Sequence, residues 1–268
     1  MPLVVCPTPI GNLEDITLRA LAELGRADLV LCEDTRRTRT LLERHGVRAK
    51  LVSYHRHNEA RRVAELLPRL EGGERVALAS DAGLPALNDP GARLIAAAIE
   101  SGVEVVVLPG PSAIETALVA SGLVGERYAF VGYVPRAAVA RERLWAEMSA
   151  WPGPVVAFES PKRLPGTLSS LAAAGPERAV AVCRELTKRF EEVVRGPAVE
   201  VAKRFREPPK GEITLVIGPA EVGLSASADD ALEVMAELTG AGVPRQKAAE
   251  VVSRLTGVSR NKLYRESL

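Results

Sequence analysis

Short apolar runs alternate with longer amphipathic stretches along the first 110 residues. The runs are four to six residues long and are typical of buried strands: Leu3–Cys6, Leu29–Cys32, Leu51–Tyr54, Arg75–Ala79 and Val103–Leu108. Helical spacing of apolar residues follows the first four runs, over Asp15–Gly25, Asp34–His45, Asn58 to Gly72 and Pro90–Ser101. Strands that alternate with helices of this length predict a mostly parallel sheet with helices on both faces.

After Pro111 the alternation continues in a different form. Strand-like runs are Tyr128–Tyr133, Val155–Phe158, Ala179–Glu185, Phe190–Arg195 and Ile213–Gly218, and helical segments are Ser112–Ala120, Ala137–Met148, Pro161–Ala174 and Pro197–Phe205. The third and fourth strands follow each other too closely for a helical crossover, so a hairpin and a mixed sheet are expected. The chain is therefore α/β, with a mostly parallel N-terminal domain (1–111) and a mixed C-terminal domain (112–222).

A small helical module (223–268) is expected at the end of the chain. A segment of small residues from Gly223 predicts a linker, and three helices follow it, at Asp230–Leu238, Arg245–Leu255 and Ser259–Ser267. The turn between the last two resembles that of a helix-turn-helix. A helical hairpin that only caps a domain fits the same pattern, and the basic side of the last helix, with Arg260 and Lys262, favours nucleic acid.

Composition narrows the class of protein. The chain has 268 residues, of which 47% are hydrophobic, and no apolar run approaches the roughly 18 residues of a membrane span. No signal peptide is recognisable, so a cytoplasmic protein without membrane contact is expected. Cys6, Cys32 and Cys183 lie far apart in apolar runs, which is typical of reduced core thiols and argues against zinc or disulfides.

The net charge of +1 conceals two basic clusters. Residues 36–62 hold nine Lys or Arg and two acids, and residues 241–268 hold six and two. Such patches suit a partner that carries phosphates, although solvated helix faces have the same composition. Arg36, Arg37 and Arg39 start a predicted helix, where they oppose the helix dipole, and this favours an external anion.

Three loops that follow apolar strands combine Pro with Gly: Pro7–Asn12, Ser80–Gly91 and Pro109–Ala113. If their strands are parallel, the loops lie at one edge of the sheet, where ligands bind in open α/β folds. Such a pocket offers mainly backbone groups and the carboxylate of Asp81, which suits a small, partly cationic guest. Ordinary connections with turn residues remain the alternative.

Several nucleotide and hydrolase motifs are missing. The chain has no GxxxxGK[ST] and no GxSxG, and no GxGxxG follows the first strand. These absences argue against P-loop enzymes, dinucleotide binding, Rossmann-like methyltransferases and an α/β-hydrolase. His55, His57 and Glu59 form an HxHxE pattern, but a metal site on one short segment without a fourth ligand is disfavoured. Asp34 and Asn58 are expected to cap helices.

Eight spaced segments carry a family resemblance. They are PTPIGNLEDITLRAL, CEDTR, SYHRHNE, SDAGLPALNDPG, PGPSA, ESPKRL, CRELTKRFEEVVRG and KGEITLVI. Together they resemble the ribosomal RNA small subunit methyltransferase I family of the tetrapyrrole-methylase-like superfamily, from about Leu3 to Gly218, and the tail resembles that family's C-terminal module. The chain departs from the family pattern at Leu84, Ala86, Leu87 and Asn88, where Thr, Gly, Ile and Ser are expected.

The resemblance implies a homodimer that transfers methyl from S-adenosylmethionine (SAM) to the ribose 2′-OH of a cytidine in the decoding centre of small-subunit (16S) rRNA, within the assembled 30S subunit. SAM would lie between the two α/β domains, and no metal is required. Cofactor contacts carried over by motif are Pro9, Ile10, Asp81, Gly83, Leu84, Ser112, Ala113, Phe158, Glu159, Cys183, Gly211, Glu212 and Ile213. Candidate bases are His55, Asp34 and Glu185, with His57, Glu59 and Lys188 as further options. RNA contacts are expected from Arg36, Arg37, Arg39, Arg56, Lys188, Arg260 and Lys262.

Two other functions stay open. A tetrapyrrole or diphthine-type SAM methyltransferase would share the fold, but GxGPGD is expected in its first loop, where this chain has PTPIGN. A SAM-sensing regulator that binds DNA through its tail would bind duplex DNA without turnover.

Overall fold

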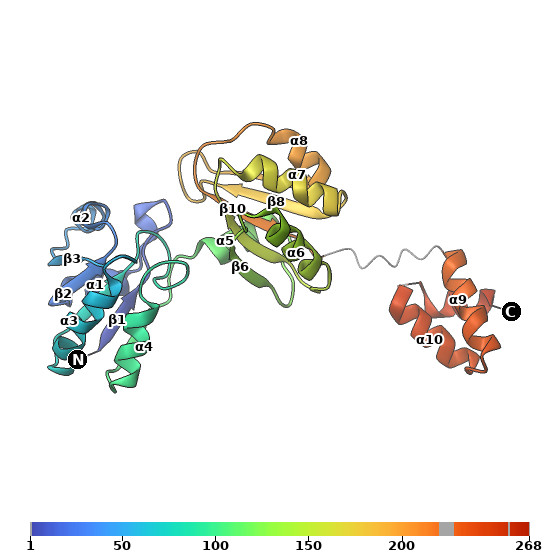
Figure 1. Cartoon of the computed structure of the whole chain (residues 1–268), viewed down its shortest axis with the longest axis horizontal. Helices are drawn as coiled ribbons and strands as arrows, with labels where there is room; N and C mark the ends of the chain where they lie inside the picture. Colours follow the sequence, from blue (N-terminus) through green and yellow to red (C-terminus); the bar gives the residue numbers. More distant parts are fainter. Residues whose placement is uncertain (1, 220–227, 257, 268) are drawn as a thin grey trace. The chain divides into compact units, whose positions relative to one another are not determined.

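The computed structural model describes residues 2–219, 228–256 and 258–267 (Figure 1). The chain divides into two compact units: residues 1–145 with 153–218, and residues 146–152 with 219–268. In the described part of the chain, no helix has both the length and the apolar character needed to cross a membrane. The predicted domain limits at 111 and 222 remain predictions.

The first sheet is parallel throughout. Its strands are β1 (Leu3–Cys6), β2 (Leu29–Cys32), β3 (Leu51–Ser53), β4 (Val76–Ala79) and β5 (Val105–Val107), in the order β3-β2-β4-β1-β5. Its helices are η1 (Leu13–Asp15), α1 (Leu18–Arg26), α2 (Thr35–Arg44), α3 (Glu59–Glu71) and α4 (Ala92–Glu100). The parallel prediction is therefore confirmed.

Successive strand residues of this sheet point to two separate cores. Val4 and Ala77 pack with Leu24 of α1 and Leu41 of α2, whereas their neighbours in the strands pack with α3 and α4 on the other face. Burial on both faces explains why these strands are continuous apolar runs. Because both faces of the sheet are covered by apolar cores, its polar groups gather at the edge where the strands run into the connecting loops.

The second sheet is mixed. Its strands are β6 (Ala129–Tyr133), β7 (Val155–Glu159), β8 (Ala179–Arg184), β9 (Glu192–Pro197) and β10 (Ile213–Ile217), in the order β6-β7-β10-β8-β9. Only β6 and β7 are parallel; the other pairs are antiparallel. The accompanying helices are α5 (Ala113–Ser121), α6 (Ala138–Ser149), α7 (Leu164–Ala174) and α8 (Ala198–Arg204). Ile114 and Leu118 of α5 pack on this sheet, and the mixed architecture is confirmed.

Some local predictions were wrong. The strand expected at Phe190–Arg195 begins at Glu192, because the Glu191 carboxylate accepts a hydrogen bond from the Thr187 N–H and closes a turn there. Asn58 precedes α3 but makes no side-chain cap; its amide oxygen accepts from the His55 N–H instead. Asp34, in contrast, caps α2 through the Arg36 N–H, as expected.

The second unit has its own core. Helices α9 (Ala228–Gly240), α10 (Arg245–Thr256) and α11 (Arg260–Glu266) enclose Met235, Ala249, Val252 and Leu263, all of which are fully buried. The linker predicted from Gly223 lies mostly outside the described residues, as does Gly257 in the predicted turn.

Candidate functional site

Three loops meet at the carboxyl edge of the first sheet because β4, β1 and β5 are neighbours and run parallel. The first loop is joined to the second by two backbone hydrogen bonds of 2.9 Å between Thr8 and Gly83. The buried Thr8 hydroxyl donates to the Ser80 carbonyl (3.0 Å), and the Ser80 hydroxyl donates to the Gly83 carbonyl (2.7 Å). The expected loop cluster is therefore a hydrogen-bonded wall.

The loop from Gly83 to Gly91 has an unusual backbone. Ala86 (φ 71°) and Asn88 (φ 63°) lie in the left-handed region without being glycine, an uncommon conformation that is enriched at functional sites. The buried Glu59 carboxylate anchors the loop by accepting hydrogen bonds from the Gly91 N–H and the Tyr54 hydroxyl, each at 3.0 Å. Glu59, a further candidate base from the HxHxE pattern, therefore has a structural task.

The second sheet contributes strand ends instead of loops. Ile213, at the start of β10, pairs with Glu159 at the end of β7 and with Arg184 at the end of β8. The antiparallel order thus brings three strand ends to one edge. The Glu159 side chain is fully buried there and is paired with Arg163 (2.5 Å).

The larger of two neighbouring cavities, about 540 Å³, lies between these two edges. We call it the cofactor cavity. Of the predicted cofactor contacts, all but Pro9 line it: Ile10, Asp81, Gly83, Leu84, Ser112, Ala113, Phe158, Glu159, Cys183, Gly211, Glu212 and Ile213. Leu87, Asn88, Asp89, Tyr133 and Leu186 complete much of the remaining wall.

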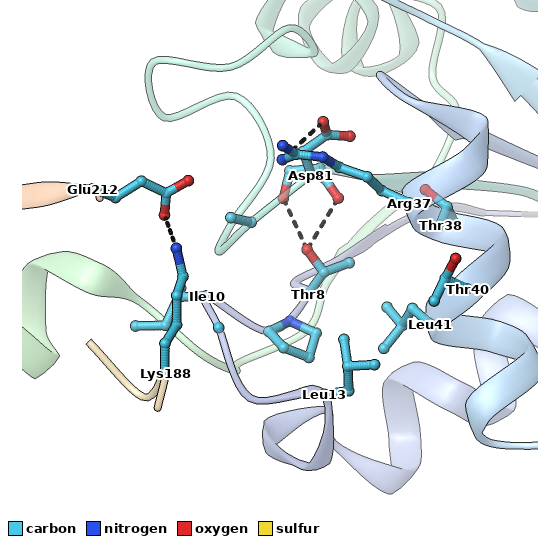
Figure 2. Close-up of a pocket in the computed structure, with 14 residues that line it drawn as sticks. Thr8, Ile10, Leu13, Arg37, Thr38, Thr40, Leu41, Asp81, Lys188 and Glu212 are labelled. Carbon is cyan, nitrogen blue, oxygen red and sulfur yellow. Dashed lines mark hydrogen bonds and ion pairs between the residues drawn. The ribbon is translucent and has the colours of Figure 1, made fainter. Parts of the chain in front are cut away.

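The smaller cavity, about 340 Å³, adjoins the cofactor cavity (Figure 2). Pro9 lines this cavity together with Thr8, Leu13, Thr38, Thr40, Leu41 and Lys188. The two cavities share five lining residues: Ile10, Arg37, Asp81, Ala82 and Glu212.

Asp81 stands in the shared wall and is held from α2. Its carboxylate accepts a hydrogen bond from the Asp34 N–H (2.9 Å) and faces the Arg37 guanidinium at 3.6 Å. On the other side of the shared wall, Lys188 Nζ lies 2.9 Å from both the Glu185 and the Glu212 carboxylates. Three carboxylates therefore lie at or beside this wall, and the two cations Arg37 and Lys188 compensate two of the three charges.

The three predicted bases lie beside the cavities without lining them. The Asp34 carboxylate is bound by the Arg36 side chain and N–H, which holds its pKa far below the usual range. Lys188 lowers the pKa of Glu185 in the same way, with help from the Glu212 N–H. Low pKa values make both carboxylates weak proton acceptors, so orienting roles suit them better.

His55 has a different environment. Its Nδ1 is buried and has no hydrogen-bond partner among the described residues, and its ring lies 5.9 Å from that of His57. The assignment of His55, Asp34 and Glu185 as bases stays a prediction.

The predicted RNA contacts fall into two groups. Arg36, Arg37 and Arg39 lie on the first turns of α2 and are exposed, as is Arg56 before α3. Arg37 and Lys188 reach the cavity walls, whereas Arg36 is occupied by Asp34 at 2.8 Å. Arg260 and Lys262 belong to the second unit, where both are exposed on α11.

Asp89 is a titratable group of the cofactor cavity to which the sequence pattern assigned no role. Burial raises its pKa to about 6, and the negative charges of Glu33 and Asp81 add to this effect, which Arg56 opposes. A carboxyl group whose pKa lies near neutrality suits general base catalysis. The burial of Asp89 and the approach of Glu33, which is distant in sequence, become visible only in the structure.

Metal and thiol chemistry have little support at this site. Across residues 2–219, 228–256 and 258–267, no group of three His, Cys, Asp or Glu could hold a metal ion. Cys183 lines the cofactor cavity, but burial raises the pKa of its thiol to about 12, so the thiolate is scarce at neutral pH.

Comparison with known proteins places the chain in a family. A sequence model described as Tetrapyrrole (Corrin/Porphyrin) Methylases matches residues 2–202. A ribosomal RNA small subunit methyltransferase I from Mesorhizobium japonicum is 43% identical over 99% of this chain and 91% of the relative. One from Escherichia coli O157:H7 is 39% identical over 99% of this chain and 94% of its own length.

Solved structures support the fold. Diphthine synthase matches with a TM-score of 0.63 and 17% identity, over 81% of this chain and 90% of that chain. Uroporphyrin-III C-methyltransferase from Thermus thermophilus, complexed with S-adenyl homocysteine, matches with a TM-score of 0.57 and 20% identity, over 82% and 98%. The family model and the near full-length relatives show that the chain belongs to the ribosomal RNA small subunit methyltransferase I family, within the tetrapyrrole methylases.

Proposed function

We propose that this protein transfers the methyl group of SAM to the ribose 2′-OH of a cytidine in small-subunit rRNA. The observation that carries the proposal is the cofactor cavity, which is lined by twelve of the thirteen residues expected to contact SAM. The full-length relatives named as rRNA methyltransferases support the choice of RNA over other acceptors.

The residues of the cofactor cavity fit SAM in size and charge. About 540 Å³ lies within the range of roughly 300–1,000 Å³ that small-molecule sites occupy. Asp81 provides negative charge for a cationic ligand, and Ile10, Leu84 and Phe158 provide apolar surface for an aromatic ring. When bound, SAM supplies an already activated methyl group, so the chain itself must mainly position and deprotonate the acceptor.

The reaction forms a bond between the ribose oxygen and the methyl carbon and breaks the bond between that carbon and sulfur, which keeps the electron pair. The hydroxyl proton must leave during or after attack. Asp89 is the acceptor that its pKa of about 6 supports best, because its carboxylate is ionised at neutral pH and still binds a proton appreciably. From Asp89 the proton passes to solvent.

The finer parts of the proposal follow from the family resemblance. They are a homodimer, the assembled 30S subunit as substrate, the decoding-centre cytidine as target, and the cytoplasm as location. Cys6, Cys32 and Cys183 are buried free thiols, which suits a reducing compartment.

The test is transfer of labelled methyl from SAM to 30S subunits from cells that lack this protein. Naked rRNA and a porphyrin precursor serve as parallel acceptors, and nuclease digestion locates the product. We expect 2′-O-methylcytidine from the subunit. Labelled porphyrin with unlabelled RNA would replace this function with that of a tetrapyrrole methyltransferase, and SAM binding with duplex DNA affinity but no transfer would favour a regulator.

A further inference from the structure

The proposed reaction assigns SAM to the cofactor cavity and no ligand to the smaller cavity. It is lined by the first loop, by α2, by the start of the second loop and by Lys188, and it lies against the cofactor cavity over five shared residues. A ligand in one cavity therefore adjoins a ligand in the other where both border Ile10, Arg37 and Asp81. Direct transfer of a group between two bound molecules requires contact of this kind.

One part of the smaller cavity is apolar. Pro9, Leu13 and Leu41 line it, and Figure 2 shows Leu13 and Leu41 close together on the side away from the ion pairs. Thr40 lies next to them, where its hydroxyl donates to the Arg36 carbonyl (3.0 Å) and keeps lone pairs that can accept hydrogen bonds. An apolar surface edged by hydroxyl acceptors suits a nucleobase with an exocyclic amino group.

The other part of the cavity is charged. Arg37 lies 3.6 Å from Asp81 with 66% of its side chain exposed, so this pair is loose and the guanidinium can turn toward another anion. Lys188 stands across the cavity beside Glu212, and the exposed Arg36 and Arg39 extend the basic surface along α2. Cations outside an apolar cavity match the phosphates on either side of a nucleotide.

We propose that the smaller cavity holds the target nucleotide of a single-stranded RNA segment, with its base against Pro9, Leu13 and Leu41 and its 2′-hydroxyl toward the shared wall. This assignment rests on the proposed function. It places a flanking phosphate at Arg37 and the reacting oxygen at Asp81 in the shared wall, facing the cofactor cavity that Asp89 lines. The volume of about 340 Å³ lies at the lower end of the roughly 300–1,000 Å³ that small-molecule sites occupy, which suits a ligand of nucleoside size.

The test is a substitution on α2 that fills the smaller cavity with a larger side chain. Thr40 is exposed on this helix and lines only the smaller cavity, so Thr40→Trp adds an indole there without disturbing a buried contact. Glu43→Trp is the matched control, since Glu43 is exposed on the same helix and lines neither cavity. Thr40→Gln intrudes less and serves as a second variant if the indole impairs folding.

Two quantities are measured for each variant: SAM affinity by calorimetry and methyl transfer to 30S subunits. For Thr40→Trp we expect SAM affinity within about twofold of wild type and kcat/KM for the subunit lower by about 100-fold or more. Thr40→Gln should show a smaller loss, and Glu43→Trp should match wild type in both measurements.

The outcomes separate this inference from the proposed function. Wild-type protein that transfers no methyl to RNA would overturn both. If wild type is active and Thr40→Trp is equally active, the RNA function stands and the cavity assignment falls. A matching loss of SAM affinity in Thr40→Trp would also overturn the assignment, because the smaller cavity would then belong to the cofactor.

Discussion

The two walls of the candidate site are built on different principles. The first sheet, which is parallel, contributes loops that are joined by neutral hydrogen bonds among Thr8, Ser80 and Gly83. The second sheet, which is mixed, contributes strand ends whose charged side chains pair with each other, as Glu159 does with Arg163 and Lys188 with Glu185. The wall of loops depends on backbone groups and on the hydroxyls of Thr8 and Ser80, so its other side chains can vary, whereas in the wall of paired charges each side chain depends on its partner.

The difference explains where the chain departs from its family pattern. Leu84, Ala86, Leu87 and Asn88 replace the expected residues in the loop wall, and the loop still lines the cofactor cavity. Its course is maintained by Gly83, Gly91 and the buried Glu59, none of which differs. We therefore expect larger penalties for substitutions in the strand-end wall.

The largest expected effect is the loss of Glu159. Its buried carboxylate also accepts hydrogen bonds from the Ser160 N–H (2.6 Å) and the Thr167 hydroxyl (2.5 Å), so Glu159→Ala leaves two donors unpaired and removes the ion pair of Arg163. We expect the free energy of unfolding in urea to fall by about 3–5 kcal/mol. Glu200→Ala removes an exposed pair with Lys203 in the same sheet domain and should cost less than about 1 kcal/mol. Equal costs would remove the distinction between buried and exposed charges.

The loop wall should matter more for turnover. Asp89→Asn keeps the shape of the side chain but removes the proton acceptor, so we expect kcat to fall by about 100-fold with little change in SAM affinity. In wild type, kcat/KM should decline as pH falls through about 6, because Asp89 then becomes protonated. A pH profile of Asp89→Asn that keeps this decline would assign the base to another residue.

The next largest effect is expected on SAM binding, from a substitution of Gly11 where the two walls meet. A Cβ on Gly11 would lie 2.5 Å from Lys188 Cγ and 2.7 Å from the Leu186 carbonyl oxygen. Gly11→Ala should therefore push the first loop off the second sheet and weaken SAM binding by about 1–3 kcal/mol in calorimetry. Gly166→Ala in α7, where nothing lies within 4 Å, is the control and should leave binding unchanged.

Asp89 should also lower stability at neutral pH. Because its folded pKa lies above the ordinary value of 3.8, the folded protein binds more protons than the unfolded chain between about pH 4 and 6. Its contribution is most favourable below pH 4 and is lost as pH rises through 6. The change in the free energy of unfolding from wild type to Asp89→Asn should thus be more favourable at pH 7.5 than at pH 4. We expect this difference to be about 1–2 kcal/mol, allowing for partial exposure. An unchanged pH dependence of urea unfolding would contradict this.

The smallest expected effect on stability comes from Arg37. Its loose, largely exposed pair with Asp81 should contribute less than about 0.5 kcal/mol, so Arg37→Gln should unfold like wild type. The same variant should bind 30S subunits more weakly. The slope of the logarithm of its binding constant against the logarithm of salt concentration should fall by the amount that about one phosphate contact contributes. An unchanged salt dependence would exclude Arg37 from the RNA contacts.

Much of this architecture was predictable from local patterns. Strands buried on both faces are continuous apolar runs, so β1, β2 and β4 were placed almost to the residue, and their parallel order implied a common loop edge. Twelve of the residues that the motifs predict as cofactor contacts line one cavity, and their roles stay predictions. What a local pattern does not contain is the partner of a polar group: Asn58 binds the His55 N–H instead of capping a helix, and Glu59 binds Gly91 from the second loop.

The wall shared by the two cavities has a consequence for inhibitor design. Because Ile10, Arg37 and Asp81 border both spaces, a molecule in one cavity and a molecule in the other lie against the same residues. A bisubstrate ligand, with a cofactor-like half joined to a nucleoside half, would need only a short tether. Its affinity would gain from the high effective concentration of the second half once the first is bound.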